Sequence, residues 1–324
     1  MKPRVGFLGV GWIGRHRMEA MLATGAVEAA AIADPSPTCI KEASGYAPAV
    51  QVVDDLDAML ALDLDGIVIA TPSAMHAEQS IRALDAGVAV FCQKPLGRTA
   101  AEVNAVIAAA ERADQLLGVD LSYRHTAGTQ AIAELIRGGT LGRIFAVDLT
   151  FHNAYGPDKP WFYDPAQAGG GCVIDLGVHL VDLALWALDF PAVSDVSAAL
   201  FANGAPLGAD AVEDYASARF RAGEADVRLA CSWRLNAGQD AVIAADFYGT
   251  GGGASLRNVD GSFYDFSAQH FAGTSATALT SGPDAWGGRA AAAWAEQLAR
   301  STAFDSAARW FAASAEVLDR IYGR

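Results

Sequence analysis

The run GVGWIG at residues 9–14 limits the possible folds of this chain more than any other feature. It follows a short apolar run, residues 5–9, that predicts a buried strand, and it leads into residues 13–24, whose apolar spacing predicts a helix. In such a turn the first glycine permits a sharp bend, the second lets backbone amides approach a pyrophosphate, and the third lets helix and strand pack closely. The context therefore predicts a βαβ unit that binds a dinucleotide, the alternative being an ordinary glycine turn.

Strand and helix patterns continue to alternate through the first half of the chain. Further strands are predicted at residues 29–33, 66–70, 88–92 and 117–121, and helices at 56–62, 77–86 and 100–113. Alternation with short connections indicates a parallel sheet covered on both faces, which binds ligands at the carboxyl ends of its strands. We expect this α/β domain to span residues 1–123.

The second half has a different pattern. After a predicted helix at 127–137, alternating segments rich in Val, Phe and Tyr predict an antiparallel sheet from residues 143–152, 193–202, 212–221, 225–234 and 241–248. A helix is predicted at 174–187, closing helices at 288–299 and 304–322, and a turn at the glycine cluster 249–253. We expect an α+β domain over residues 124–324, whose last helices can pack back on the first domain.

Composition excludes several classes of function. The formal net charge of −14 makes the chain a poor partner for nucleic acid or an anionic membrane surface. No stretch approaches the roughly 18–20 uninterrupted apolar residues that span a bilayer, and the N-terminus lacks a signal-peptide pattern. The four cysteines lie far apart without a CxxC pair, which disfavours a zinc ribbon or disulfide scaffold. We expect a soluble cytoplasmic protein.

Asp34 closes the second predicted strand, where a carboxylate can accept hydrogen bonds from both adenosine ribose hydroxyls. A carboxylate there repels a 2′-phosphate, and no Arg or Lys follows before Lys41. The sequence therefore favours NAD over NADP. The alternative reading of Asp34 is a helix N-cap.

Two more strand ends carry polar motifs. Thr71-Pro72-Ser73 follows the third predicted strand, with His76 soon after, and lines the cofactor's path or simply caps a helix through Ser73. Gln93-Lys94-Pro95 ends the next strand, at the edge where the nicotinamide of a bound dinucleotide should lie. The alternative for Lys94 is a solvated loop lysine.

Asp175 and His179 are four residues apart in the helix predicted at 174–187, so they share one face about a turn apart, and Asp182 continues that face. Such a histidine is either structural, catalytic or one ligand of a metal site. No complementary His-x-x-x-His or Cys pair accompanies it, so we predict no metal.

Taken together, several motifs resemble the glucose–fructose oxidoreductase/inositol dehydrogenase (Gfo/Idh/MocA) family across essentially the whole chain. They are GVGWIG at 9–14, Asp34, TPSAMHAE at 71–78, QKPL at 93–96 and DPAQAGGGCVIDLGVH at 164–179. The resemblance implies a doubly wound Rossmann domain, then a domain with an open-faced, mostly antiparallel sheet that commonly forms dimer or tetramer contacts.

The resemblance also implies roles for individual residues. It maps the family's Glu-Lys-Pro motif onto Gln93-Lys94-Pro95, and its Asp-x-x-x-His motif onto Asp175 and His179. Gln93 departs from the family glutamate, which is thought to contact the nicotinamide ribose. Phe162 also departs, because many relatives carry Arg after the tryptophan equivalent to Trp161.

Alcohol oxidation removes a hydride from carbon and a proton from oxygen. His179 is the best general base, because imidazole titrates near neutral pH, and Asp175 can orient it or relay a proton. The Lys94 ammonium can bind the substrate oxygen and stabilise alkoxide charge. Among weaker candidates, Arg124 either contacts substrate or cofactor or pairs with an acidic neighbour, and His152 ends a strand leading toward Trp161. Trp161 and Trp233 either stack on a sugar or belong to the core.

These observations predict an NAD-dependent dehydrogenase acting on a sugar, inositol or related polyol, as a homodimer or homotetramer. The alternatives are a dinucleotide- or sugar-sensing regulatory protein and an NAD-retaining lyase or glycosidase. The expected catalytic residues are Lys94, Asp175 and His179. The expected cofactor contacts are Gly9, Gly11, Trp12, Ile13, Gly14, Asp34, Thr71, Pro72, Ser73, His76, Gln93 and Lys94. The expected substrate contacts are Lys94, Arg124, His152, Trp161, Asp175 and His179.

Overall fold

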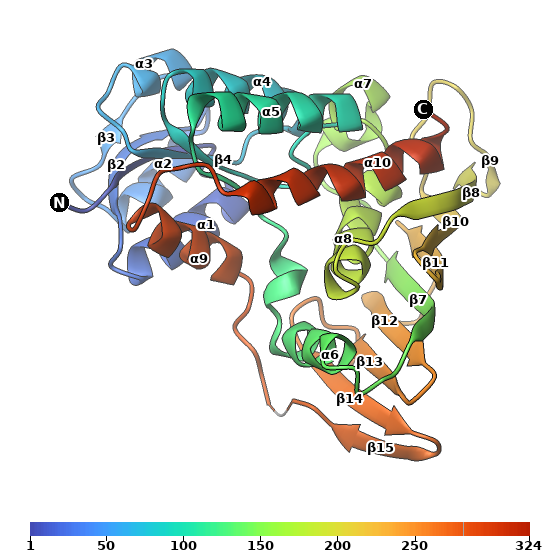
Figure 1. The fold of residues 1–324 in the computed structure, drawn as a ribbon. Helices are drawn as coiled ribbons and strands as arrows, with labels where there is room; N and C mark the ends of the chain where they lie inside the picture. Colours follow the sequence, from blue (N-terminus) through green and yellow to red (C-terminus); the bar gives the residue numbers. More distant parts are fainter. Residues whose placement is uncertain (281) are drawn as a thin grey trace. The chain divides into compact units, whose positions relative to one another are not determined.

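The computed structural model describes residues 1–280 and 282–324. The chain forms two compact units, which Figure 1 shows along the sequence. The first contains Met1–Asp120 and Gly288–Ala312, and the second contains Leu121–Gly287 and Ala313–Arg324. The chain therefore returns to the first unit after the sheet of the second is complete. We expected a single division at residue 123, with the closing helices packing back on the first domain. In the structure, residues 288–312 belong to the first unit.

The first unit is built on a parallel six-stranded sheet with the order β3-β2-β1-β4-β5-β6. This is the doubly wound Rossmann order, so the predicted fold of this part is confirmed. Its strands are β1 (Arg4–Leu8), β2 (Glu28–Ala33), β3 (Gln51–Val52), β4 (Gly66–Ile69), β5 (Ala89–Cys92) and β6 (Leu117–Val119). Its helices are α1 (Trp12–Ala23), α2 (Pro37–Ser44), α3 (Leu56–Leu60), α4 (Ser73–Asp85), α5 (Ala100–Ala113), α9 (Arg289–Leu298) and the 3₁₀ helix η4 (Ser306–Trp310).

Glycines inside the parallel sheet make room for α9. A Cβ on Gly66 would lie 2.8 Å from the Trp294 ring, and a Cβ on Gly118 would lie 2.5 Å from it. Trp294 also packs against Phe91 of β5, with ring centroids 5.7 Å apart. Any side chain at either glycine would push α9 off the sheet, so both glycines are needed for this packing.

The second unit is built on a nine-stranded sheet with the order β15-β14-β13-β12-β7-β11-β10-β8-β9. Neighbouring strands are antiparallel except β7 and β11, so the predicted mostly antiparallel sheet is confirmed. The strands are β7 (Ile144–Asn153), β8 (Val193–Ala202), β9 (Ala205–Pro206), β10 (Tyr215–Ala222), β11 (Ala225–Ser232), β12 (Ala241–Gly249), β13 (Gly253–Asn258), β14 (Phe266–Ala272) and β15 (Ser275–Ala278). The glycine cluster is the turn between β12 and β13, as predicted.

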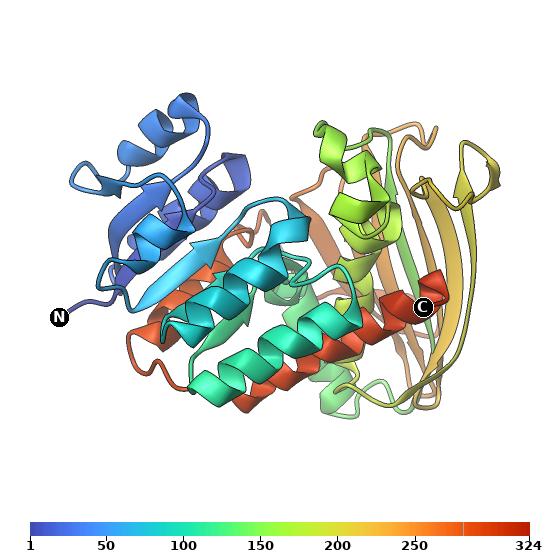
Figure 2. The same ribbon diagram turned by 90° about the horizontal axis from the view of Figure 1, so that it is seen from above.

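The longer helices of the second unit are α6 (Ala127–Arg137), α8 (Val178–Ala187) and α10 (Phe311–Tyr322), and its other helical segments are short. The short segments are η1 (Ser122–His125), η2 (Pro160–Tyr163), α7 (Pro165–Ala168) and the π-helix η3 (Val173–Gly177). α8 lies along one face of the sheet (Figure 2). The predicted single helix at 174–187 is therefore a π-helical turn followed by an α-helix, and this difference affects the candidate site.

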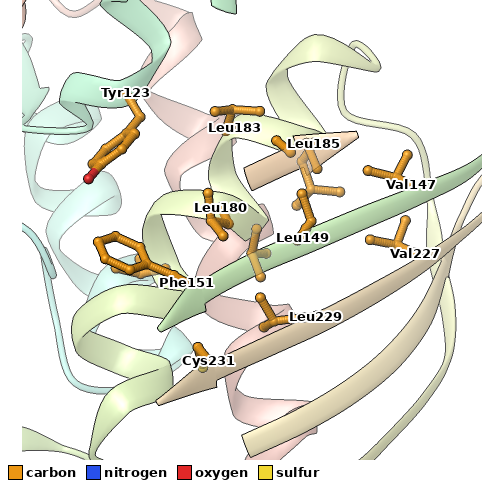
Figure 3. Packing of buried hydrophobic residues seen from close by; sticks show 14 of the residues in the cluster. Tyr123, Val147, Leu149, Phe151, Leu180, Leu183, Leu185, Val227, Leu229 and Cys231 are labelled. Carbon is orange, nitrogen blue, oxygen red and sulfur yellow. The ribbon is translucent and has the colours of Figure 1, made fainter. Parts of the chain in front are cut away.

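The core of the second unit lies between α8 and the central strands. Figure 3 shows Leu180 and Leu183 of α8 over Leu149 of β7 and Leu229 of β11, all at most 2% exposed. Because side chains alternate along a strand, the even-numbered residues of β7 point to the opposite face. There Asp148 accepts from Arg228 at 2.6 Å. One face of this sheet is therefore a packed core and the other is polar.

One segment of the described chain, Pro165–Ala187, is long and apolar enough to cross a membrane by length and composition alone. However, 89% of its most apolar window is buried inside the protein. Burial of this kind is what a core helix shows, so the segment is weak evidence for a membrane span.

Candidate active site

The three glycines of the first loop meet three different steric demands. Gly9 has φ +85, and a Cβ there would lie 2.5 Å from the Ala70 carbonyl oxygen. A Cβ on Gly14 would lie 2.1 Å from the Gly9 carbonyl oxygen. A Cβ on Gly11, in contrast, would have no neighbour within 4 Å. The backbone at Gly11 therefore faces open space at the start of α1, which is the approach that a pyrophosphate needs.

Asp34 lies beside this loop. One carboxylate oxygen accepts from the Val10 backbone N–H at 2.8 Å, and the other accepts from the Ser36 N–H at 2.8 Å. Each carboxylate oxygen can accept a further hydrogen bond, so the group retains capacity for ribose hydroxyls. The N-cap of α2 is Ser36 and not Asp34, because the Ser36 hydroxyl accepts from the Cys39 N–H. The helix-cap alternative for Asp34 is therefore wrong.

The turn after β4 is held together by buried polar groups. The N-cap of α4 is Pro72, and Ser73 is already helical and only 5% exposed, so the predicted cap at Ser73 is wrong. Thr71 donates its hydroxyl to the Gln79 side chain at 2.6 Å. His76 is 1% exposed, with one ring nitrogen 2.7 Å from the Thr71 carbonyl oxygen and the other 2.6 Å from that of Pro95.

His76 therefore joins the turn after β4 to the turn after β5, where Lys94 lies. Both of its ring nitrogens face backbone carbonyls, which leaves neither available to a cofactor. We replace its predicted cofactor contact with a positioning role for the two turns. Burial lowers the pKa of His76, against the opposing effect of the two carbonyl groups, and nearby Lys94 lowers it further.

Lys94 lies in the turn after β5. The side chain of the preceding residue, Gln93, points into the protein. The Gln93 side-chain oxygen accepts from the Lys94 backbone N–H at 2.9 Å, and its amide group donates to Asp120 at 2.8 Å. Asp120, 1% exposed, also accepts from Arg17 of α1 at 2.6 Å. Neither Asp120 nor Arg17 belongs to the set that we expected from the sequence.

In the second unit, the entry to η3 wraps around a buried carboxylate that we did not predict. The backbone N–H groups of Gly171 and Val173 donate to the Glu213 side chain at 2.9 and 2.8 Å, and the Tyr322 hydroxyl donates at 2.8 Å. A Cβ on Gly171 would lie 2.0 Å from the Glu213 carbonyl oxygen. Burial raises the pKa of Glu213, and its donors partly offset this. The glycine-rich segment therefore serves a structural role that fixes the start of η3.

Asp175 lies in η3, where the π-helical turn contains one more residue than an α-helical turn and changes its angular relation to His179. Its carboxylate accepts from the Trp233 indole N–H at 3.1 Å. Trp233 is 3% exposed, so it belongs to the core and orients Asp175. The His179 ring packs against Tyr123, with centroids 4.8 Å apart, and against Phe151 at 6.5 Å. A partly buried imidazole and an oriented carboxylate thus lie at the start of α8.

The structure shows the surroundings of three predicted substrate contacts. Arg124 pairs through two hydrogen bonds with Asp182, which is 1% exposed, so the acidic-neighbour alternative holds. His152 points to the polar face of the sheet, opposite α8, where Ser232 lies 2.8 Å from its ring. Trp161 stacks on Phe162 with centroids 3.8 Å apart and is partly buried. Of these, only Trp161 remains a candidate for contact with a sugar.

Among the residues that the structure describes, no group of three or more His, Cys, Asp or Glu side chains is arranged to hold a metal ion. The candidate cofactor contacts lie in the first unit, and the proton-transfer candidates Asp175 and His179 lie in the second.

Comparison with known protein families matches both units. Residues 3–121 match the oxidoreductase family with an NAD-binding Rossmann fold, and residues 129–255 match the GFO/IDH/MocA C-terminal domain. The chain is 31% identical over 277 residues to an oxidoreductase subunit named for UDP-kanosamine synthesis in Amycolatopsis mediterranei, covering 79% of this chain and 75% of that protein.

Other curated relatives match over shorter stretches. The chain is 34% identical over 152 residues to D-glucoside 3-dehydrogenase of Escherichia coli, covering 46% of this chain and 43% of that one. It is 30% identical over 195 residues to inositol 2-dehydrogenase of Rhizobium meliloti, covering 60% and 57%. These matches thus span about half the length of each relative.

Solved structures share the fold over the whole chain. GenD2 from gentamicin A biosynthesis, in complex with NAD, aligns with a TM-score of 0.82 at 23% identity, covering 99% of this chain and 93% of that one. Levoglucosan dehydrogenase in complex with NADH and levoglucosan aligns with a TM-score of 0.80 at 23% identity, covering 98% and 94%.

Proposed function

Because the chain belongs to the Gfo/Idh/MocA family of oxidoreductases with an NAD-binding Rossmann fold, we propose that it is an NAD-dependent dehydrogenase. It transfers a hydride between nicotinamide and a hydroxyl carbon of a sugar, inositol or related polyol. The observation that carries the proposal is the loop at Gly11, which is open for a pyrophosphate and has Asp34 beside it. Relatives named for dehydrogenation of a glucoside and of inositol support the substrate class.

The residues of the first unit fit the pyrophosphate and the adenosine ribose of a dinucleotide. The open backbone at Gly11 and the start of α1 suit the pyrophosphate, and the Asp34 carboxylate suits the ribose hydroxyls. The same carboxylate disfavours a 2′-phosphate, so we propose NAD and not NADP. Trp12, Ile13, Thr71 and Pro72 complete the proposed cofactor contacts. When bound, NAD supplies the acceptor for the hydride.

The protein's own side chains handle the proton. We propose that Lys94, Asp175 and His179 act on one substrate hydroxyl, with His179 taking the proton as general base. Asp175, oriented by the Trp233 indole, in turn orients His179 or relays its proton. The Lys94 ammonium stabilises negative charge on the substrate oxygen, which a cation does best in a site closed to water.

We propose assembly into a homodimer or homotetramer through the polar face of the nine-stranded sheet, and a cytoplasmic location. This face has a broad hollow of about 800 Å³. The ion pairs Arg228–Asp148 and Arg257–Asp246 lie in it, with N–O distances of 2.6 and 2.7 Å. The exposed side chain of Tyr248, which also lines this hollow, adds apolar area that a second copy would cover.

A screen of aldoses, inositols and sugar acids tests the proposed function by following NADH absorbance, with NAD and NADP in parallel. We expect turnover with at least one compound, and a clear preference for NAD. Tight NAD binding without turnover across the panel would favour a sensing protein instead. Product formation without net NADH would identify an NAD-retaining lyase or glycosidase.

A further inference from the structure

A short chain of buried and partly buried hydrogen bonds connects the helix after the glycine loop to Lys94. Arg17 of α1 donates from Nε to Asp120 Oδ2 at 2.6 Å, and Gln93 donates from Nε2 to the same oxygen at 2.8 Å. At its other end, Gln93 Oε1 accepts from the Lys94 backbone N–H at 2.9 Å. Arg17 is 7% exposed and Asp120 is 1% exposed, so water competes little for these bonds.

The partners fix which end of the Gln93 amide points where. A backbone N–H only donates, so the oxygen of the amide faces Lys94. A carboxylate only accepts, so the NH₂ group faces Asp120. This is a site that requires an amide, because no ionised carboxylate can donate to Asp120. A glutamate at position 93 would bring a second negative charge next to a buried one.

The backbone gives this contact little freedom to open. The Gln93 N–H donates to the Ile69 carbonyl at 2.8 Å, and the Asp120 N–H donates to the Cys92 carbonyl at 2.9 Å. Both residues are thus tied to the ends of neighbouring parallel strands. Arg17 and Asp120 form a buried ion pair, so a carboxylate placed against Asp120 would be repelled by a buried negative charge.

We propose that Arg17, Asp120 and Gln93 form a clamp that positions Lys94, and that Asp120 makes an amide, and not a carboxylate, necessary at position 93. All three are positioning residues that act through the backbone of Lys94. Gln93 then points into the clamp and does not contact the nicotinamide ribose. The kinetic part of the proposal rests on the proposed function of Lys94, whereas the coupling between positions 93 and 120 does not.

A double-mutant cycle on thermal stability tests the coupling without reference to activity. The proteins are the wild type, Gln93→Glu, Asp120→Asn and Gln93→Glu/Asp120→Asn. We expect Gln93→Glu to lower the melting temperature by about 5 °C or more. The double variant should recover much of that loss, because an amide at position 120 can donate to a carboxylate at position 93. If Gln93→Glu does not fold, recovery of a folded double variant is the supporting result.

The matched control is Gln51→Glu, which adds the same charge at an exposed position of β3. Its effect should add to that of Asp120→Asn without coupling. Acid pH provides a second check, because two facing carboxylates raise the pKa of one of them. The stability deficit of Gln93→Glu should therefore shrink as the pH falls toward 5, where the shared site takes up a proton. An equal deficit at all pH values, or a double variant that is no more stable than Gln93→Glu, overturns the proposal.

Kinetics then test whether the clamp acts on Lys94. With an active substrate, Gln93→Glu should lower kcat by about 100-fold, the scale expected for a reacting group misplaced by about 1 Å. The double variant should regain most of this loss. The dissociation constant of NAD, set mainly at Gly11 and Asp34, should change less than kcat. Rescue of stability without rescue of kcat would refute the positioning role. A wild type that neither binds NAD nor turns over would refute the proposed function but leave the stability cycle as the test of the clamp.

Discussion

Gly11 offers a substitution that separates cofactor binding from folding. Gly11 is the N-cap of α1 with φ −59 and ψ −174, a conformation that any residue adopts without strain. A Cβ there has no neighbour within 4 Å. Gly11→Ala therefore introduces a methyl group into open space, which is the space that a pyrophosphate must enter.

Two opposing effects set the magnitude for folding. Alanine is a poorer N-cap than glycine by about 0.5–1 kcal/mol. Replacing glycine by alanine at an unstrained position stabilises by about 0.4–1 kcal/mol through the unfolded chain. These effects nearly cancel, so we expect the melting temperature to stay within about 2 °C of the wild type. For binding, forcing a methyl group into a close contact costs about 1.4–2.8 kcal/mol, or a 10- to 100-fold loss of NAD affinity.

The assay is a calorimetric titration with NAD beside a thermal melt of the same samples. Trp12, which is 61% exposed and adjacent to Gly11, gives a fluorescence signal for the same titration. Gly14→Ala is the matched contrast. Its Cβ would lie 2.1 Å from the Gly9 carbonyl oxygen, so it should lower the melting temperature as well as NAD affinity. Unchanged NAD affinity in Gly11→Ala, with the fold intact, would refute the assignment of this loop.

Other residues give predictions of different kinds. Trp233→Phe removes the indole donor to Asp175 and should lower kcat about tenfold with little change in NAD affinity, measured by steady-state kinetics and titration. Arg124→Met leaves the buried Asp182 carboxylate without its bidentate partner and should destabilise by about 3–5 kcal/mol in urea denaturation, whereas unchanged stability would contradict the pairing. The lowered pKa of His76 means that its contribution to stability is present above pH 6.5 and is lost as the pH falls through that value toward the folded-state pKa. His76→Gln should flatten this dependence in melts between pH 8 and pH 5, and an unchanged slope would show that another group controls it.

Local chemistry explains why much of the first unit was predictable. Gly9 has a positive φ, Gly11 faces open space and Gly14 packs against the Gly9 carbonyl, so the local pattern predicts these three glycines, although Gly9 also lies against Ala70. The helix α2 and the strands β3 and β9 were missed because they are short or polar. Strands β13 and β15 were missed for a related reason, since their Ser- and Ala-containing sequences lack the Val, Phe and Tyr enrichment that marks a strand. Strand β14 was missed although it contains two phenylalanines.

The surroundings of the candidate site were less predictable because they depend on residues far apart in the chain. Trp233 and Asp175 are 58 residues apart, as are Arg124 and Asp182, and no local pattern links such pairs. The extra residue in the π-helical turn of η3 also leaves no periodic signal in the sequence. The orientation of the Gln93 side chain could not be predicted either, because it depends on Asp120 at the end of a neighbouring strand.

The most direct test of the proposed mechanism asks whether Lys94 of the first unit and His179 of the second act in one site. A double-mutant cycle in kcat/KM compares Lys94→Ala, His179→Ala and the double variant, with Lys94→Ala/His270→Ala as the control cycle. Groups that act together on one substrate hydroxyl are strongly non-additive, so the double variant should be little worse than the poorer single variant. The His270 control, on β14, should be additive. Additive losses for Lys94 and His179, or near-wild-type turnover in either single variant, would contradict the shared site.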